Sequence, residues 1–270
     1  MERVGDLFSV ALVTGASSGL GLAFTRLLLD EGVSVIGLSR SPEIPDAPDH
    51  YTPWAIDLSD LDALPQTLEA IFEQFSEIDL VINNAGFGVL EHLQAQSVDE
   101  IQRQYSVMLG APTLMAAQAL RSFEARGVAG CLMNVSSLAV ELPLPLMPIY
   151  NACKAGLSAL SDSLLLDASG ANKPYRVIDF RPGDFNTNFA QRMTGRVEWN
   201  GADLREVMDR HHAKAPTVKV ALKGFRRALM QKKSGRVRVG DFFQAMIAPL
   251  GPRLFPSSWL RAIIRWYYRK

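Results

Sequence analysis

Short apolar segments alternate with longer amphipathic segments along most of this chain. The apolar segments cover residues 8–14, 33–38, 51–56, 79–83, 130–135, 176–180 and 236–240. Apolar residues recur at helical spacing over 20–30, 60–75, 98–124 and 148–169. Near-continuous apolar strands that alternate with helices are typical of a parallel sheet whose two faces are both covered. The pattern therefore predicts an α/β, doubly wound fold with a seven-stranded parallel sheet in the order 3-2-1-4-5-6-7.

Two regions depart from this alternation. Residues 186–216 are polar and helix-prone, and we expect them to form a flap over a site at the sheet edge. Residues 242–270 read as a basic, amphipathic C-terminal extension, so the expected main domain is 1–241 with the flap included. In doubly wound sheets, ligands bind beyond the carboxyl ends of the strands. Residues that directly follow a strand are therefore the first candidates for chemistry.

Composition predicts one cytoplasmic globular unit. The chain has 270 residues, 48% of them hydrophobic, which is enough for one sizeable core. Its first residues lack a signal-peptide pattern, and no apolar stretch reaches the ~20 residues of a membrane span. Cys131 and Cys153 stand in no pairing or metal-ligand pattern and are expected to be reduced thiols. His211 and His212 lack partners at metal spacing, so we interpret them as surface residues and expect no metal.

The charges are unevenly distributed although the formal net charge is zero. From Arg210 to Lys270 the chain has fifteen Lys or Arg and one acid, Asp241. Such a basic region suits an anionic membrane, a phosphorylated ligand or an acidic partner, unless its cations are spread over separate solvated faces. Within 259–270, arginines at four-residue spacing accompany aromatic and aliphatic residues. This helix is expected either to lie peripherally on anionic lipid or to pack on the body or on a second subunit, and nucleic acid is not an expected partner.

The segment Thr14 to Gly21 joins the first strand to the first helix and contains three glycines. Glycines let the backbone turn tightly and approach a pyrophosphate closely, and the helix N-terminus offers unpaired amides to an anion. The location at a strand-to-helix junction disfavours the alternative of plain turn glycines. The cofactor-binding residues expected here are Gly15, Ser17, Ser18, Gly19, Leu20 and Gly21.

The end of the second strand indicates which dinucleotide binds. It reads Ser39-Arg40 and offers no carboxylate to a ribose hydroxyl, whereas a cation there would meet the extra phosphate of NADP. NADP (NADPH) is therefore favoured over NAD, although Arg40 could also be an ordinary exposed arginine. Asp57 and Leu58, after the third strand, are expected near the adenine, with an N-cap role for the following helix as the alternative.

Tyr150 and Lys154 are four residues apart in the expected helix 148–169, so both side chains rise from one helix face. A nearby ammonium stabilises a phenolate and lowers the pKa of a tyrosine from about 10, which makes the phenol a usable general acid or base. Taken alone, the two residues could also be a chance pair on a solvated face. Two further expected strands end in polar residues, at Asn83 and at Ser136-Ser137.

These motifs together resemble the short-chain dehydrogenase/reductase family, whose members have a Rossmann fold. The shared features are the glycine pattern of 14–21, Asn-Asn-Ala-Gly at 83–86, a serine thirteen residues before the tyrosine, the Tyr-x-x-x-Lys pair, and Pro-Gly-x-x-x-Thr at 182–187. They follow the family's order over roughly residues 8–190. Each motif is common alone, but five in order at fitting separations make the resemblance specific.

The resemblance implies hydride transfer between a nicotinamide and an alcohol or carbonyl carbon. Tyr150 would donate or accept the hydroxyl proton, Lys154 would lower its pKa and hold the nicotinamide ribose, and Ser137 would hydrogen-bond the substrate oxygen. Ser136 competes for the serine role, but the spacing favours Ser137. The further cofactor residues that the resemblance implies are Asn83, Ala85, Gly86, Pro182, Gly183, Phe185 and Thr187. A homodimer or homotetramer is implied as well.

The chain departs from the family pattern in one helix. The family usually has an asparagine there that helps a water-linked proton path from the lysine, and this chain reads Ser106-Val107-Met108. Either a backbone carbonyl and water still serve, or the proton relay is impaired. A non-catalytic dinucleotide-binding sensor or scaffold therefore stays an alternative to an NADP-dependent oxidoreductase.

Apolar residues dominate the flap region and the loop after Ser137. They predict a hydrophobic ketone, aldehyde or acyl-type substrate, including a lipid-like one, unless they belong to the core or to subunit contacts. They are Phe185, Phe189, Met193, Val197 and Trp199 in the first region, and Leu138, Val140, Leu142, Leu144, Leu146 and Met147 in the second.

Overall fold

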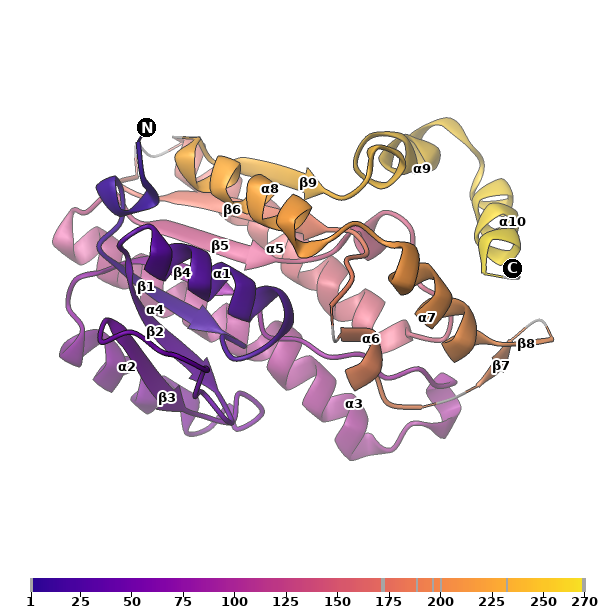
Figure 1. Ribbon diagram of the computed structural model, residues 1–270, viewed down its shortest axis with the longest axis horizontal. Coiled ribbons are helices and arrows are strands. Elements are labelled where there is room, and N and C mark those ends of the chain that lie inside the picture. Colours follow the sequence, from indigo (N-terminus) through magenta and orange to yellow (C-terminus); the bar gives the residue numbers. More distant parts are fainter. Residues whose placement is uncertain are drawn as a thin grey trace.

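A parallel sheet forms the centre of the protein (Figure 1). The computed structural model describes residues 2–170, 173–187, 189–195, 197–199, 201–231 and 233–268. Within these residues the sheet has seven strands in the order β3-β2-β1-β4-β5-β6-β9, and every neighbouring pair is parallel. The strands are β1 (Val10–Thr14), β2 (Ser34–Ser39), β3 (Tyr51–Ala55), β4 (Ile78–Asn83), β5 (Cys131–Val135), β6 (Arg176–Pro182) and β9 (Gly235–Val239). The predicted doubly wound fold and its strand order are confirmed.

Helices cover both faces of the sheet, as the apolar strands require (Figure 1). One face carries α1 (Gly19–Asp30) and α8 (Val218–Met230), whose Phe24 and Phe225 rings stack 4.1 Å apart. The other face carries α2 (Leu64–Gln74), α3 (Val98–Tyr105), α4 (Ala111–Arg126) and α5 (Pro148–Gly170). The sequence analysis did not assign α8, although a crossover helix is needed to bring the chain from β6 back to a parallel β9.

Two expected helices differ from the structure. The helix expected over 60–75 begins only at Leu64. The long helix expected over 98–124 is divided into α3 and α4 by a π-turn at Ser106–Gly110. Pro112 stands just after the π-turn, where it has no N–H to donate to a carbonyl of the preceding turn. The widened turn lies at the position where the family pattern expects its asparagine.

Two segments of the last third of the chain lie beyond the carboxyl ends of the strands, namely the flap region and the residues after β9 (Figure 1). The flap region contains α6 (Phe189–Arg192), the short strands β7 (Glu198–Trp199) and β8 (Ala202–Asp203), and α7 (Leu204–Lys214). After β9 follow α9 (Gly251–Leu254) and α10 (Ser257–Tyr267). Ile264 and Tyr268 pack with Met208 of α7 in one apolar cluster, so the end of the chain rests on the flap. Among the described helices, none is both long and apolar enough to cross a bilayer.

Candidate functional site: a cleft at the carboxyl edge of the sheet

A cavity of about 1240 Å³ lies at the carboxyl ends of the strands and collects the residues that directly follow them. All but one of the predicted site residues line it. They are Gly15, Ser17, Ser18, Gly19, Leu20, Gly21, Ser39, Arg40, Asp57, Leu58, Ala85, Gly86, Ser137, Tyr150, Lys154, Pro182, Gly183, Phe185 and Thr187. Residues from six strand ends and from the flap therefore meet in one place.

Asn83 is the exception, and its predicted place at the cofactor is wrong. Its side chain is buried below the cavity and donates to the carbonyl oxygen of Pro112 at 3.1 Å and to Asn134 Oδ1 at 2.8 Å. Asn84 lines the cavity instead, and its side chain donates to the carbonyl oxygen of Thr14 at 3.0 Å. Successive side chains of an extended segment point to opposite sides. The Asn83 side chain therefore points into the core, and that of Asn84, the next residue, points into the cleft.

The glycine loop has the geometry of an anion cradle. Gly15 and Gly19 have φ values of +67° and +55°, in the left-handed region that favours glycine. A Cβ on Gly21 would lie 2.1 Å from the carbonyl oxygen of Gly15, so the first turn of α1 passes the loop at a distance that only glycine permits. This leaves the backbone amides at the N-terminus of α1 open to the cleft. The residues present thus fit a dinucleotide pyrophosphate.

The loop after β2 stands beside the glycine loop. Ser39 Oγ is 3.0 Å from Ser17 Oγ, and Arg40 is exposed at the rim of the cavity. Asp57 accepts hydrogen bonds from Ser59 N at 2.9 Å and from Ser59 Oγ at 2.7 Å, and these bonds lower the pKa of its carboxyl. Since α2 begins only at Leu64, Asp57 is not the N-cap of that helix. The adenosine end of the cleft therefore offers a cation and hydroxyls at its rim.

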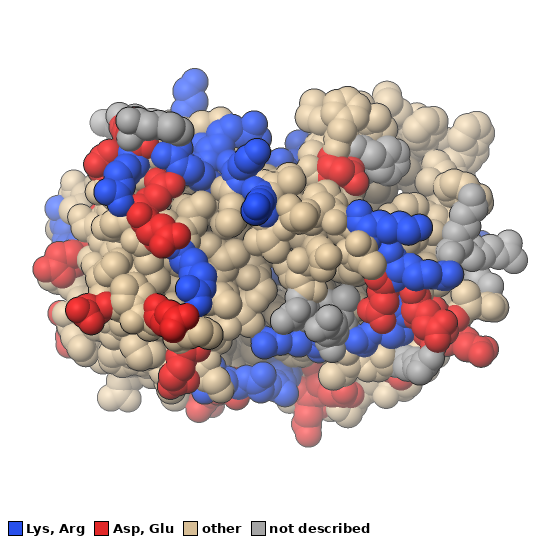
Figure 2. Space-filling view, viewed as in Figure 1, with Lys and Arg blue, Asp and Glu red and all other residues tan. Residues whose placement is uncertain are grey.

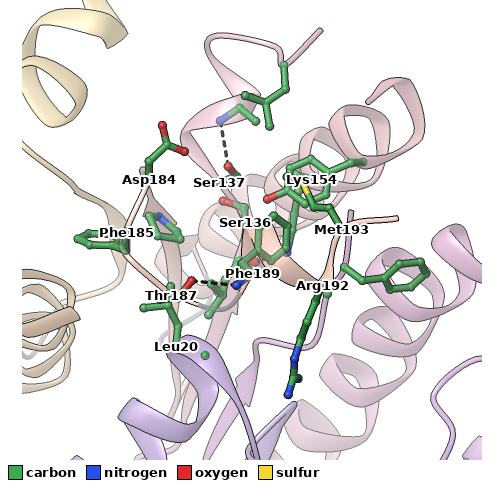
Figure 3. Close-up of a pocket in the computed structure, with 18 of the residues that line it drawn as sticks. Leu20, Ser136, Ser137, Lys154, Asp184, Phe185, Thr187, Phe189, Arg192 and Met193 are labelled. Carbon is green, nitrogen blue, oxygen red and sulfur yellow. Dashed lines mark hydrogen bonds between the residues drawn. The ribbon is translucent and has the colours of Figure 1, made fainter. Parts of the chain in front are cut away.

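Ser137, Tyr150 and Lys154 all line the cavity, and Figure 3 shows Ser137 and Lys154 close to each other. Ser137 follows β5 and caps a short 3₁₀ turn, where its Oγ accepts from Ala139 N at 3.0 Å. Tyr150 and Lys154 project from α5, and Lys154 Nζ is 5.9 Å from the centre of the Tyr150 ring. The side chains of all three residues are at least nine-tenths buried. Two hydroxyls and a cation thus share one buried site.

Burial dominates the ionisation of the Tyr150 phenol. Desolvation raises its pKa to about 12, while a hydrogen bond with Ser137 lowers it and the Asp184 charge raises it. The lowering of this pKa that the sequence analysis expects from Lys154 is therefore not seen here, because burial dominates. The ammonium of Lys154 donates to a backbone carbonyl rather than to the phenol. Tyr150 is consequently protonated over the neutral range, which is the state that a proton donor needs.

In the segment where the family pattern has its asparagine, Val107 lines the cavity, whereas Met108 is fully buried. The π-turn closes with a bond from Ala111 N to the carbonyl oxygen of Ser106, one residue further back than in an α-helix. A turn of this width shifts the hydrogen-bond register of the helix by one residue and can leave a backbone carbonyl without its helical partner. The backbone route considered from the sequence is thus compatible with the local geometry, but Val107 itself has no group that can relay a proton.

Apolar side chains form the wall opposite the glycine loop. Of the eleven predicted pocket residues, Leu138, Leu142, Leu144, Phe185, Phe189 and Met193 line the cavity. The other five, Val140, Leu146, Met147, Val197 and Trp199, lie outside its lining. Half of the predicted apolar set therefore faces the cleft, and the rest packs elsewhere.

His211 and His212 of α7 also line this cavity, so their interpretation as surface residues is wrong. The His211 ring is 4.4 Å from Tyr267 and 5.6 Å from Tyr268, centre to centre. Burial lowers the pKa of its imidazole, which favours the neutral ring at physiological pH. Within the described residues no group of His, Cys, Asp and Glu is arranged to hold a metal ion.

The sequence analysis missed Arg192 and Asp184. Arg192 lines the cavity, is exposed, and has no ion pair within the described part of the chain. Its side chain extends from the flap toward the side of the cavity on which Leu20 lies (Figure 3). Asp184 follows Gly183 and accepts a hydrogen bond from Gln244 Nε2 at 3.2 Å. No local pattern in the sequence marks either residue, because the fold of the flap brings them to the cleft.

Comparison with known proteins gives a consistent assignment. Residues 9–197 match the family model described as short chain dehydrogenase. A human relative, "Dehydrogenase/reductase SDR family member 11", is 31% identical over 221 residues, which cover 77% of this chain and 84% of that protein.

Two solved structures show the same fold. A short-chain dehydrogenase from Streptomyces avermitilis superposes with a TM-score of 0.77 at 24% identity and covers 97% of this chain and 96% of its own. A metagenomic short-chain oxidoreductase in complex with NADP has a TM-score of 0.60 at 30% identity and covers 66% of this chain and 83% of its own.

Proposed function

Because the chain belongs to the short-chain dehydrogenase family, we propose that it is an NADP(H)-dependent oxidoreductase that acts on a hydrophobic alcohol or carbonyl substrate. The observation that carries the proposal is the meeting of Ser137, Tyr150 and Lys154 with the glycine cradle in one cavity. The cradle fits a dinucleotide, and the three side chains fit the proton chemistry of a carbonyl group. A bound nicotinamide would supply or take up the hydride.

Tyr150, Ser137 and Lys154 have different roles in the proposed reaction. In the reducing direction, the Tyr150 hydroxyl gives its proton to the carbonyl oxygen as hydride arrives at the carbon, which yields the alcohol and the oxidised cofactor. Ser137 Oγ donates a hydrogen bond to the same oxygen and fixes its position. Lys154 supplies positive charge behind the phenol and stabilises the phenolate that remains. Burial of all three excludes water from the proton transfer.

Arg40 supports the preference for NADP(H). It is exposed at the rim beside Ser39, and the end of β2 has no carboxylate that would reject a phosphate. The metagenomic relative that binds NADP is consistent with this preference. Arg192 adds a second cation from the flap, and we assign it to the pyrophosphate, since the loop at 14–21 contains no Lys or Arg of its own.

The substrate class follows from the wall opposite the cradle. Leu142, Leu144, Phe189 and Met193 line the same cavity as Tyr150, and the ring centres of Phe189 and Tyr150 are 6.0 Å apart. A site of this kind favours a ketone, aldehyde or acyl-type carbonyl with a long apolar substituent over a sugar, whose hydroxyls would lose their hydrogen bonds there.

NADPH oxidation with a panel of apolar ketones and aldehydes tests the proposal. Wild type is expected to reduce members of the panel, and Tyr150→Phe is expected to lose at least about 100-fold in kcat. NADPH binding, followed by nicotinamide fluorescence, should stay within about twofold in the same variant. Normal NADPH binding without turnover of any carbonyl would instead favour the alternative, a dinucleotide-binding sensor or scaffold.

A further inference from the structure

Helix α10 rests on the body through one stripe of residues. Leu260, Ile264 and Tyr268 recur every four residues and are the parts of the helix that are shielded from solvent. Tyr268 packs against His211 of α7, and Tyr267 contacts the same ring. The helix is therefore fixed to the flap along one side, and the rest of its circumference faces the cavity and the solvent.

The exposed side of α10 that borders the cavity is apolar. Trp259, Ile263 and Trp266 follow helical spacing on one face and are 62%, 48% and 59% exposed. The segment before the helix extends this surface, and the Phe255 ring stacks on Trp259 at 6.3 Å. Its other exposed apolar residues are Phe242, Met246, Ile247, Leu250 and Leu254. In Figure 2 the surface over α9 and α10 is mostly tan, and so large an apolar patch marks an interaction surface.

The charges of this segment have a single sign. Residues 242–270 contain five Lys or Arg and no Asp or Glu. Arg261 and Arg265 lie one turn apart on a different side of the helix from Trp259 and Trp266, and both are exposed. An amphipathic helix with interfacial tryptophans on its apolar face and cations on its polar side complements the acyl chains and the anionic headgroups of a bilayer.

We propose that the surface formed by Phe242–Leu254 and α10, called here the tail surface, docks on a bilayer that contains anionic lipid. The tail surface also borders the catalytic cavity, because α10 contributes Leu260, Ile263, Ile264 and Trp266 to its lining. Docking therefore turns the mouth of the cavity toward the bilayer. An apolar carbonyl compound dissolved in the lipid then reaches Tyr150 without crossing water. This last step rests on the proposed function, whereas docking itself does not.

Vesicle binding of the full-length protein tests docking without substrate or cofactor. Wild type is expected to sediment with vesicles of phosphatidylcholine and phosphatidylglycerol and to remain in the supernatant with phosphatidylcholine alone. Its tryptophan fluorescence should shift to shorter wavelength on binding. Arg261→Glu/Arg265→Glu should bind the anionic vesicles at least about thirtyfold more weakly, and Trp259→Ser should reduce both binding and the spectral shift.

The matched control is Lys219→Glu/Lys223→Glu, which changes the same number of exposed charges at the same spacing on α8. It should bind like wild type. Equal loss in both double variants would show a response to net charge alone and would overturn the proposal. Equal binding to neutral vesicles, absence of binding, or a dimer in solution that Trp259→Ser dissociates would overturn it as well.

Activity assays separate the docking step from the proposed function. Arg261→Glu/Arg265→Glu should keep wild-type kcat/KM toward a short, water-soluble carbonyl compound, since neither arginine lines the cavity. It should lose at least about tenfold toward a long-chain carbonyl compound embedded in anionic vesicles. Vesicle binding by a protein that reduces no carbonyl would support docking and contradict the proposed function. Reduction of both substrates at wild-type rates by the double variant would overturn delivery from the bilayer.

Discussion

Lys154 Nζ lies 2.7 Å from the carbonyl oxygen of Val135, the last residue of β5, and donates a hydrogen bond to it. The lysine side chain is 4% exposed and has no carboxylate within ion-pair distance in the described part of the chain. Burial lowers the pKa of its ammonium from 10.5 to about 8. The hydrogen bond to the Val135 carbonyl therefore stabilises an ammonium whose charged form is disfavoured by burial.

Lys154→Met is expected to stabilise the protein and to inactivate it. A folded pKa of about 8 below an unfolded value of 10.5 costs about 3 kcal/mol at neutral pH. The lost bond to Val135 offsets about 1 kcal/mol, so the variant should gain about 2 kcal/mol in free energy of unfolding at pH 7. Urea denaturation measures the gain in free energy of unfolding, and NADPH oxidation measures the loss of activity.

The sign of this effect can be checked with pH. The unfolded chain binds a proton at this lysine up to pH 10.5, whereas the folded chain releases it near pH 8, so wild-type stability rises with pH between these values. The difference in free energy of unfolding between Lys154→Met and wild type should therefore be constant below about pH 8 and should shrink toward pH 10. A difference that is constant up to pH 10 contradicts the assignment.

The rate of carbonyl reduction should have an alkaline limb set by Lys154. Tyr150, with a pKa of about 12, stays protonated as a donor, whereas Lys154 loses its charge above about pH 8. We expect kcat/KM to be flat below about pH 7.5 and to fall above about pH 8. Lys154→Arg keeps the charge at all these pH values and should lose the limb, whatever its absolute rate. If kcat/KM of Lys154→Arg still falls above about pH 8, the alkaline limb belongs to another titrating group.

The strand ends were the part of the site that the sequence could predict. A parallel sheet brings its carboxyl edges together, so the strand pattern alone predicts that Gly15, Ser39 and Ser137 lie at one cleft, as they do. Asn83 was misplaced, because the strand extends through it and turns its side chain into the core.

The flap could not be predicted in the same way. Arg192 and His211 reach the cavity through packing of α6, α7 and α10, which no local pattern records. The ionisation of Tyr150 was misjudged for a related reason. A spacing of four residues gives the proximity of Lys154, but the burial that outweighs its charge depends on the whole fold.

Arg40→Ala should weaken the binding of NADPH but not that of NADH. A charge-assisted hydrogen bond to a phosphate contributes about 1.5–3 kcal/mol, so the Kd of NADPH should rise about tenfold to 100-fold. The Kd of NADH, which lacks that phosphate, should change less than about twofold. Titration of nicotinamide fluorescence measures both, with the exposed Arg121→Ala as the matched control. Equal weakening of both cofactors would remove Arg40 from the phosphate site.

Arg192→Ala should weaken the binding of NADPH and of NADH to the same extent, because both cofactors carry the pyrophosphate that Arg192 is proposed to contact. We expect a rise of about tenfold in both Kd values, a smaller rise at high salt, and partial recovery in Arg192→Lys. This common effect distinguishes Arg192 from Arg40. A change confined to the KM of the carbonyl substrate would place Arg192 at the substrate instead.

Val107→Asn tests whether the missing asparagine limits the rate. Val107 lines the cavity beside the π-turn and is only partly buried, so an amide of similar volume fits without overpacking. An added donor and acceptor would extend the water-linked path behind Lys154. We expect kcat for carbonyl reduction to rise about tenfold and the solvent deuterium isotope effect on kcat to fall. Val107→Leu, which adds volume without a polar group, should leave the isotope effect at the wild-type value. If kcat and the isotope effect are both unchanged in Val107→Asn, a backbone carbonyl of the π-turn already serves the relay.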